Sequence, residues 1–177
     1  RMVRVGKHER LRSTKRDLTG YFHQLDISMP SGEHAWQRYW GIGIPEYILN
    51  KMKSRPTDEY ELTYFSLPMG FFGSVFIAQE LLEEACRQAG LPRQKQITRG
   101  PLPTSLPVWG AQIDDFWSIG TTRDAETISD WGEQVGKVWE DFDLEENKSK
   151  RVTNETDAEV LGKQVREKGQ IGLSGEK

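Results

Sequence analysis

The segment "WGAQIDDFWSIG" (residues 109–120) sets two adjacent aspartates, Asp114 and Asp115, between short apolar runs. Runs of this length around a polar pair are typical of two β-strands joined by a tight turn. Aspartate favours turns because its side chain hydrogen-bonds to nearby backbone. Adjacent carboxylates repel each other, however, and flanking strands limit their hydration unless a cation neutralises them. The segment therefore predicts a hairpin whose turn holds both acids, either as a purely structural turn or as part of a cation site.

Amphipathic helices are expected on both sides of this hairpin. Residues 74–90 begin with Ser74, a residue that caps helices, and are closed by Gly90 and Pro92. The buried face of this helix is expected at Phe76 or Ile77, Leu81, Ala85 and Ala89. Residues 121–144 form the second helix, with an apolar stripe of Ile128, Trp131, Val135, Val138, Trp139 and Phe142.

The remaining segments complete an alternation of strands and helices. Residues 17–27 indicate a strand that runs into a turn or short helix, and residues 91–107, with four prolines, an irregular loop. Two further hairpins are expected, one from strands at 35–44 and 60–67 and one at 159–165 with a last turn at Lys168-Gly169. This order predicts an α+β fold, with helices packed on one face of an antiparallel sheet as in ferredoxin-like domains.

Composition and charge narrow the classes of protein. The chain has 177 residues, a net charge of −3 and six Trp, seven Phe and five Tyr, which indicates a globular domain rather than a disordered one. Residues 1–16 hold seven Lys or Arg against one acid, so this segment either contacts phosphates or is a solvated flank. The lone Cys86 excludes an internal disulfide, and no apolar run is long enough to cross a bilayer. We expect an intracellular protein of the cytoplasm or nucleus, and a chain excerpted from a longer one.

Three motifs occur together in a known order. "DLTGYF" (residues 17–22), "LPMGFFGSVFIAQ" (67–79) and "IDDF" (113–116) follow one another as the palm motifs of reverse transcriptases do. From about Asp17 to Gly162 the chain resembles the palm domain of a retroelement reverse transcriptase, of the LTR-retrotransposon type. The resemblance implies an α+β polymerase palm with partial fingers elements over residues 17–167. It implies a basic N-terminal flank over 1–16 and a polar tail over 168–177 that starts a truncated connection.

The resemblance also assigns roles to residues. Asp17 matches the first catalytic aspartate, and Asp114 and Asp115 match the pair at the primer terminus. Two Mg²⁺ ions, with Mn²⁺ as an alternative, are implied as cofactors, with Asp17 and Asp114 as direct ligands and Asp115 as a further candidate ligand. Lys150 matches a late lysine of the family, which would donate a proton to the leaving pyrophosphate; a solvated base in "KSKR" is the alternative. Candidate nucleotide-binding residues are Phe22 at the steric gate, Met69, Gly70 and Gln112.

The implied function is RNA-directed DNA polymerisation, in which deoxynucleotides are added to a primer on an RNA or DNA template. Fingers, thumb and RNase H regions are expected elsewhere in a full-length polyprotein, so this segment alone is expected to be weak or inactive. The alternative is a decayed or domesticated palm that serves as a nucleic-acid-binding or structural module. One departure favours it: the segment "STKRD" is charged where the family has an apolar strand, so either the strand begins at Asp17 or the sequence has drifted.

Overall fold

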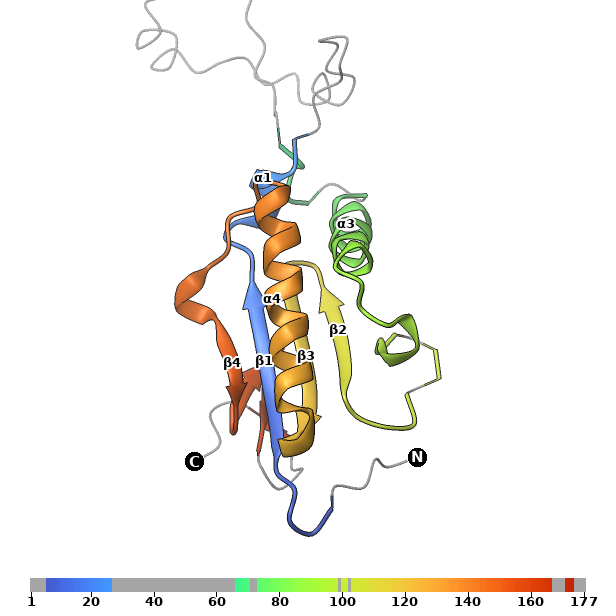
Figure 1. Cartoon of the computed structure of the whole chain (residues 1–177). Helices are drawn as coiled ribbons and strands as arrows, with labels where there is room; N and C mark the ends of the chain where they lie inside the picture. The colour runs from blue at the N-terminus through green and yellow to red at the C-terminus, as the bar shows by residue number, and fades with distance from the viewer. Residues whose placement is uncertain are drawn as a thin grey trace, which may run out of the picture. The chain divides into compact units, whose positions relative to one another are not determined.

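A computed structural model shows the arrangement of the chain (Figure 1). It describes residues 6–26, 66–70, 73–98, 100–101, 103–166 and 171–173. The chain divides into two compact units, one formed by residues 1–21 and 75–177 and the other by residues 22–74. The predicted strand at 35–44, residues 60–65 of the strand predicted at 60–67, and the predicted turn at Lys168-Gly169 lie outside the described residues.

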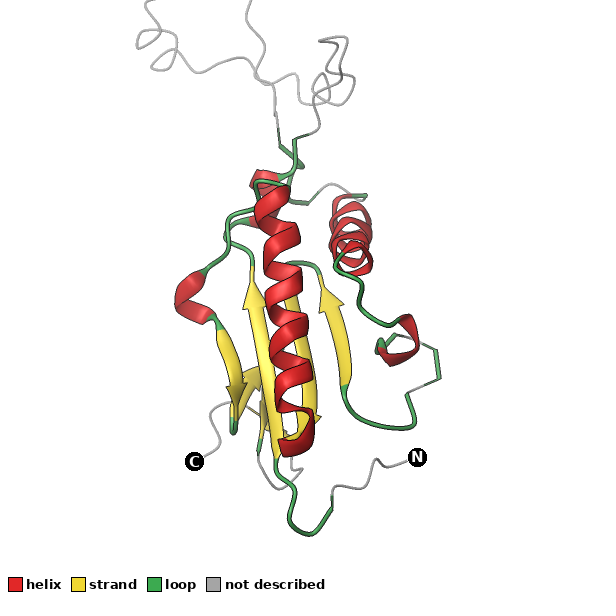
Figure 2. Ribbon diagram, in the orientation of Figure 1, coloured by secondary structure: helices red, strands yellow, loops and turns green. Residues whose placement is uncertain are grey.

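The larger unit is built on a four-stranded antiparallel sheet in the order β2-β3-β1-β4. Its strands are β1 (Leu11–Asp17), β2 (Val108–Gln112), β3 (Asp115–Thr121) and β4 (Val152–Glu155). The two long helices are α3 (Ser74–Gln88) and α4 (Ala125–Asp141). Figure 2 shows α4 in front of the sheet and running roughly along its strands, and α4 contacts β1, β3 and β4. The expected α+β class, with an antiparallel sheet and packed helices, is confirmed.

A second, three-stranded sheet contributes to the core of this unit. It consists of β5 (Ala158–Val160), β6 (Lys163–Val165) and β7 (Ile171–Leu173) in that order. The predicted hairpin at 159–165 is thus confirmed, and Leu161 and Gly162 form its turn with positive φ angles. Leu11 and Trp117 of the first sheet share a buried cluster with Val160 and Val165 of the second.

Helix α4 follows its predicted apolar stripe closely. Its buried residues are Ile128, Trp131, Gly132, Val135, Gly136 and Trp139. Phe142 caps the end of the helix and is 46% exposed, so the stripe stops one turn earlier than expected. Short 3₁₀ helices, η3 (Thr122–Asp124) and η4 (Lys148–Lys150), precede and follow this segment.

Helix α3 forms where expected, but its buried face matches the prediction only in part. Its buried hydrophobic residues are Ala78, Leu82, Ala85 and Cys86, whereas Phe76 is 69% and Leu81 45% exposed. The prediction is confirmed at Ala85 and wrong at Leu81 and at Phe76, and the alternative to Phe76, Ile77, is half-buried. Leu81 and Leu82 are neighbours, so apolar spacing alone fits either face. The loop that follows contains the 3₁₀ helix η2 (Arg93–Lys95), and residues 91–107 otherwise lack regular structure where they are described.

The charged stretch before Asp17 is one of the two inner strands of the sheet, between β3 and β4. Strand β1 begins at Leu11 and ends at Asp17, so the expectation of a strand that starts at Asp17 is wrong. Residues 11–16 likewise belong to the sheet and not to a solvated flank. The guanidinium of Arg16 is buried but paired with the carboxylates of Glu133 and Glu146, at 2.8 Å each. Paired charges can be buried at far smaller cost than lone ones, which is why this polar strand forms.

The smaller unit is described over residues 22–26, 66–70 and 73–74. The short helix α1 (Tyr21–Gln24) begins at the boundary between the units, and it confirms the expected turn or short helix after Asp17. Within the smaller unit, Asp26 pairs with Ser66 in an isolated bridge, and the backbone N–H of Leu67 donates to the carbonyl of Leu25 at 2.9 Å.

Candidate polymerase site

Three of the predicted site residues lie in one row across the sheet. Asp17 of β1 pairs directly with Asp115 of β3, and Asp115 pairs with Gln112 of β2. Residues opposite each other on neighbouring strands project from the same face of a sheet. Thr14 and Arg16 pack against α4, so the alternation of side chains along β1 places Asp17 on the opposite face. The acids therefore gather at one end of the sheet, on the face away from α4.

The hairpin turn consists of Ile113 and Asp114. Gln112 and Asp115 form the last pair of the ladder, so Asp115 is the first residue of β3 and the expectation that the turn holds both acids is corrected. Ile113 has a φ of 55°, a conformation that such two-residue turns require. The backbone N–H of Leu18 donates to the carbonyl of Asp114 at 2.9 Å, which ties the turn to the end of β1.

Gln79 of α3 holds the other side of this turn. Its Nε2 donates to the carbonyl of Ala111 at 2.9 Å, and its Oε1 accepts from the backbone N–H of Ile113 at 2.8 Å. One amide side chain thus satisfies a donor and an acceptor where the ladder ends. The motif "LPMGFFGSVFIAQ" ends at Gln79, but we did not predict a role for this residue.

Lys150 contacts the first predicted aspartate. Its Nζ donates to both carboxylate oxygens of Asp17, at 3.1 and 3.2 Å. The Asp17 side chain is 7% exposed and that of Lys150 58% exposed, so the lysine covers the carboxylate from the solvent side. The hydrogen bond that Lys150 donates to the Asp17 carboxylate raises the pKa of Lys150 above its usual value. This contact argues against the interpretation of Lys150 as a purely solvated base, and its role as a proton donor to pyrophosphate stays a prediction.

Lys15 is a second cation at the acids, and sequence reasoning missed it. Its Nζ lies 3.0 Å from Asp115 Oδ1, and both side chains are largely buried. Burial raises the pKa of Asp115 above its ordinary value of 3.8; Lys15 lowers it, and the nearby carboxylates Asp17 and Asp114 raise it. Lys15 stands two residues before Asp17, so strand alternation through "STKRD" would have placed it on the same face.

The carboxylates of Asp17, Asp114 and Asp115 are chemically suited to bind a hard cation. Carboxylate oxygens are the ligands that Mg²⁺ prefers, and Asp115 Oδ1 is a buried carboxylate oxygen whose charged neighbour is Lys15 Nζ at 3.0 Å. In this arrangement, however, Lys150 and Lys15 each lie against one of the acids. Within the described ranges, no group of three or more His, Cys, Asp or Glu is drawn together closely enough to hold a metal. A cation at Asp17 would therefore require Lys150 to move.

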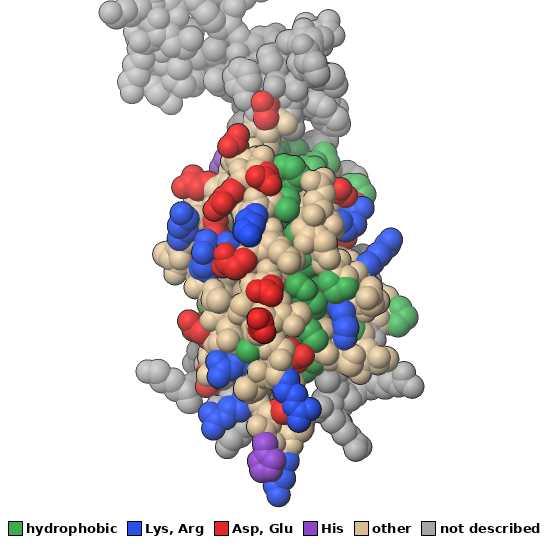
Figure 3. All heavy atoms as spheres, viewed as in Figure 1, with side chains coloured by type: hydrophobic (Ala, Val, Ile, Leu, Met, Phe, Trp, Pro, Cys, Tyr) green, Lys and Arg blue, Asp and Glu red, His purple; other side chains and the backbone are tan. Residues whose placement is uncertain are grey.

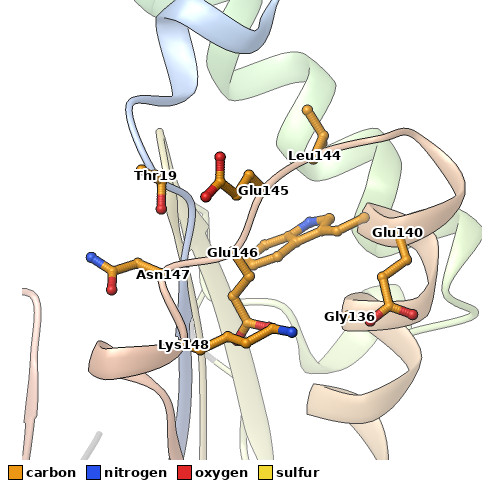
Figure 4. A pocket seen from close by; sticks show the side chains of 9 residues that line it. Thr19, Gly136, Glu140, Leu144, Glu145, Glu146, Asn147 and Lys148 are labelled. Carbon is orange, nitrogen blue, oxygen red and sulfur yellow. The ribbon is translucent and has the colours of Figure 1, made fainter.

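A separate pocket of about 540 Å³ lies beside α4 (Figure 4). The pocket is lined by Gly136, Glu140 and the segment 144–148, together with Thr19 and Trp139. The residues predicted for catalysis and nucleotide binding are not among them. The pocket is thus distinct from the row of acids on the opposite face of the sheet.

The other predicted nucleotide-binding residues belong to the smaller unit. Phe22 lies in α1 and is half-buried, and Met69 is 70% exposed. Gly70 has a φ of +89°, a left-handed conformation that favours glycine over residues with a side chain. Their roles at a nucleotide remain predictions.

The surface around α4 carries charges of both signs. On the face seen in Figure 3, acidic and basic side chains are interspersed rather than gathered into one basic patch. Arg16 and Lys15 are engaged with acids inside the unit, and Arg12 donates to the carbonyl of Asn154 at 2.9 Å. These three side chains therefore serve the fold.

Comparison with known proteins adds no assignment: no protein-family model matches the sequence, and neither does any curated protein. In the part of the chain that the structure describes, no helix has the length and apolar character needed to span a membrane.

Proposed function

We propose that this chain carries the palm of an RNA-directed DNA polymerase of the reverse transcriptase type. The observation that carries the proposal is the direct pairing of Asp17 with Asp115 beside the Asp114 turn, because acids from two sequence motifs meet at one end of the sheet. The order of elements is β1, α3, β2, β3, α4, β4, with strand order β2-β3-β1-β4. This succession is that of a ferredoxin-like domain, the fold implied for a palm, and it supports the proposal.

The reaction would add a deoxynucleotide to the 3′ end of a primer on an RNA or DNA template. The chemistry that two bound Mg²⁺ ions supply is activation of the 3′-hydroxyl and neutralisation of charge on the phosphoryl group. Asp17 and Asp114 would hold the ions, with Asp115 as a third carboxylate that Lys15 restrains. Lys150, once released from Asp17, would donate its Nζ proton to the departing pyrophosphate.

The role of Asp114 is tested by Asp114→Asn in the complete polymerase. This substitution removes a proposed ligand from a turn whose backbone contacts do not depend on the carboxylate, so we expect the fold to remain and primer extension to be abolished. Asp141→Asn, at the exposed end of α4, is the matched control and should extend primers normally. Near-normal extension by a folded Asp114→Asn protein would contradict the metal assignment.

A specific observation favours a second candidate, a catalytically inactive palm that serves as a binding or structural module. Lys150 and Lys15 already neutralise Asp17 and Asp115, so the acids have internal counter-ions without any metal. Binding of Mg²⁺ or Mn²⁺ separates the two candidates, because an inactive module stabilised by its own lysines should bind neither ion at these acids.

A further inference from the structure

Glu146 lies at the centre of a buried ion-pair network. Its side chain is 8% exposed and accepts hydrogen bonds from two arginines. Arg16 Nη1 donates to Glu146 Oε2 at 2.8 Å. Arg151 donates two hydrogen bonds to Glu146, one from Nε to Oε1 at 2.9 Å and one from Nη2 to Oε2. The two residues thus form a bidentate pair. Bidentate arginine–carboxylate pairs fix orientation as well as contributing energy.

The backbone next to Glu146 is attached to the end of β1. Glu146 forms an isolated bridge with Leu18, and the N–H of Asn147 donates to the carbonyl of Asp17 at 2.7 Å. From Asn147 the chain makes the single turn η4, in which the N–H of Lys150 donates to the carbonyl of Asn147 at 3.0 Å. This turn ends at Lys150, the residue immediately before Arg151.

We propose that Glu146 is a positioning residue: by holding Arg151 in a bidentate pair, it keeps Lys150 against the carboxylate of Asp17. Both ends of the turn are then fixed, the first by the Asn147 hydrogen bond and the last by Arg151. The catalytic value of this positioning rests on the proposed polymerase function, in which a cation would displace Lys150 Nζ from Asp17 while the fixed turn keeps Lys150 beside the site to act at the leaving group. The positioning itself is a property of the folded chain.

The two arginines allow structural and positioning effects to be separated. Arg16 is 3% exposed, and loss of its Glu146 partner leaves a buried guanidinium with Glu133 alone, so Glu146→Gln is expected to weaken the fold. Arg151 is 30% exposed, and its removal leaves the Arg16–Glu146 pair in place. Arg151→Ala is therefore the main test variant, and Arg87→Ala, which removes an arginine from a surface pair with Glu84, is the matched control.

The first measurement is the rate at which an amine-acylating reagent modifies Lys150 in the metal-free chain, followed by peptide mass spectrometry. An ammonium that donates to a carboxylate reacts slowly, and Lys148 in the same turn is the internal reference. In Arg151→Ala we expect the rate at Lys150 relative to Lys148 to rise about two- to fivefold, a factor typical of losing an exposed ion pair. Arg87→Ala should leave the ratio unchanged. An unchanged ratio in Arg151→Ala and in folded Glu146→Gln would overturn the proposal.

The second measurement is primer extension by the complete polymerase carrying the same variants. Loss of positioning at a proton donor should lower kcat about tenfold or more, part of the factor that a general acid contributes, with KM for the deoxynucleotide little changed. The rate is expressed per active enzyme, because a purely structural role would lower only the amount of active protein and leave both kcat per active enzyme and KM unchanged. If the unaltered polymerase extends no primer, the proposed function fails, whereas the acylation ratio still decides the positioning.

Discussion

At the scale of single residues, the pKa of Asp115 is set by burial and by the charged groups around it. Asp115 pairs across the sheet with Asp17 and directly follows Asp114 in the chain. Burial favours the protonated form of its carboxyl group. Lys15 opposes this effect from the neighbouring strand position on the same face. The site therefore combines three acids with two lysines, and the net charge of these five side chains is −1 when all are ionised.

The raised pKa of Asp115 predicts a pH dependence of stability. The folded protein retains this proton at pH values where the unfolded chain has already lost it, so the carboxyl's contribution to the free energy of unfolding falls as pH rises from about 3.8 through the raised value. Asp115→Asn removes the titration. The free energy of unfolding of Asp115→Asn minus that of the unaltered protein should therefore become more positive between about pH 4 and pH 7.

Urea denaturation at the two pH values, in the presence of EDTA, measures this difference. Asp141→Asn, at an exposed position, is the control and should show no comparable change. A difference for Asp115→Asn that is equal at both pH values would show that Asp115 has the same pKa in the folded and unfolded chain.

Gly136 is a second residue whose effect depends on one neighbour. A Cβ built at this position would overlap the guanidinium of Arg16. Alanine usually stabilises a helix interior relative to glycine, but here the crowding should dominate, and Gly136→Ala should lower the free energy of unfolding by about 1–3 kcal/mol. Gln134→Ala, on the exposed side of α4, should change it by less than about 0.5 kcal/mol. Chemical denaturation distinguishes the two; equal stability of both variants would contradict the close packing of α4 on β1.

At the scale of elements, the buried face of α3 differs in part from the face predicted from the sequence, and this difference can be tested. Leu82 is fully buried, whereas its neighbour Leu81 is 45% exposed. Leu82→Ala should therefore cost about 2–5 kcal/mol of stability, while Leu81→Ala should cost less than about 1 kcal/mol. The two variants remove the same atoms from adjacent positions, so each is the control for the other in thermal or chemical unfolding. A larger loss from Leu81→Ala would restore the face predicted from the sequence.

Elements that are specified by residues within their own segment could be predicted from the sequence. Features that depend on contacts with residues far away in the chain could not. Both helices and the hairpins around Ile113 and Gly162 follow from apolar spacing and turn residues within each segment. The buried face of α3 depends on what packs against it, which spacing does not reveal. Strand β1 was missed over residues 11–16 because its charged side chains are compensated by Glu133, Glu146 and Asp115, all more than ninety positions later in the chain.

The residues of the candidate site also fall into those that the sequence could predict and those that it could not. Asp17, Asp114 and Asp115 are selected from motif order; the structure pairs Asp17 with Asp115, and the catalytic roles of all three stay predictions. The supporting residues Lys15, Gln79 and Glu146 carry no motif of their own, and their contacts arise only from the folded sheet.

At the scale of the whole molecule, a metal that binds the folded chain should stabilise it. A ligand that binds only the native state raises the unfolding temperature as its concentration increases. We expect Mg²⁺ and Mn²⁺ to raise the unfolding temperature of the unaltered chain but not that of Asp17→Asn or Asp114→Asn, as followed by circular dichroism. Asp141→Asn should respond as the unaltered chain does. Identical responses in all four proteins would favour the inactive-module candidate.

The inner position of β1 has a consequence for synthesis of the chain. β1 ends at residue 17, but its two neighbours, β3 and β4, begin at residues 115 and 152. During translation this strand must wait on the order of ten seconds for its first partner, with its backbone donors and acceptors unpaired. Apolar strands in that condition associate with other chains, whereas serine, threonine, lysine and arginine oppose such pairing. We therefore expect the polar sequence "RSTKR" to oppose aggregation of the nascent chain before its ion pairs can form.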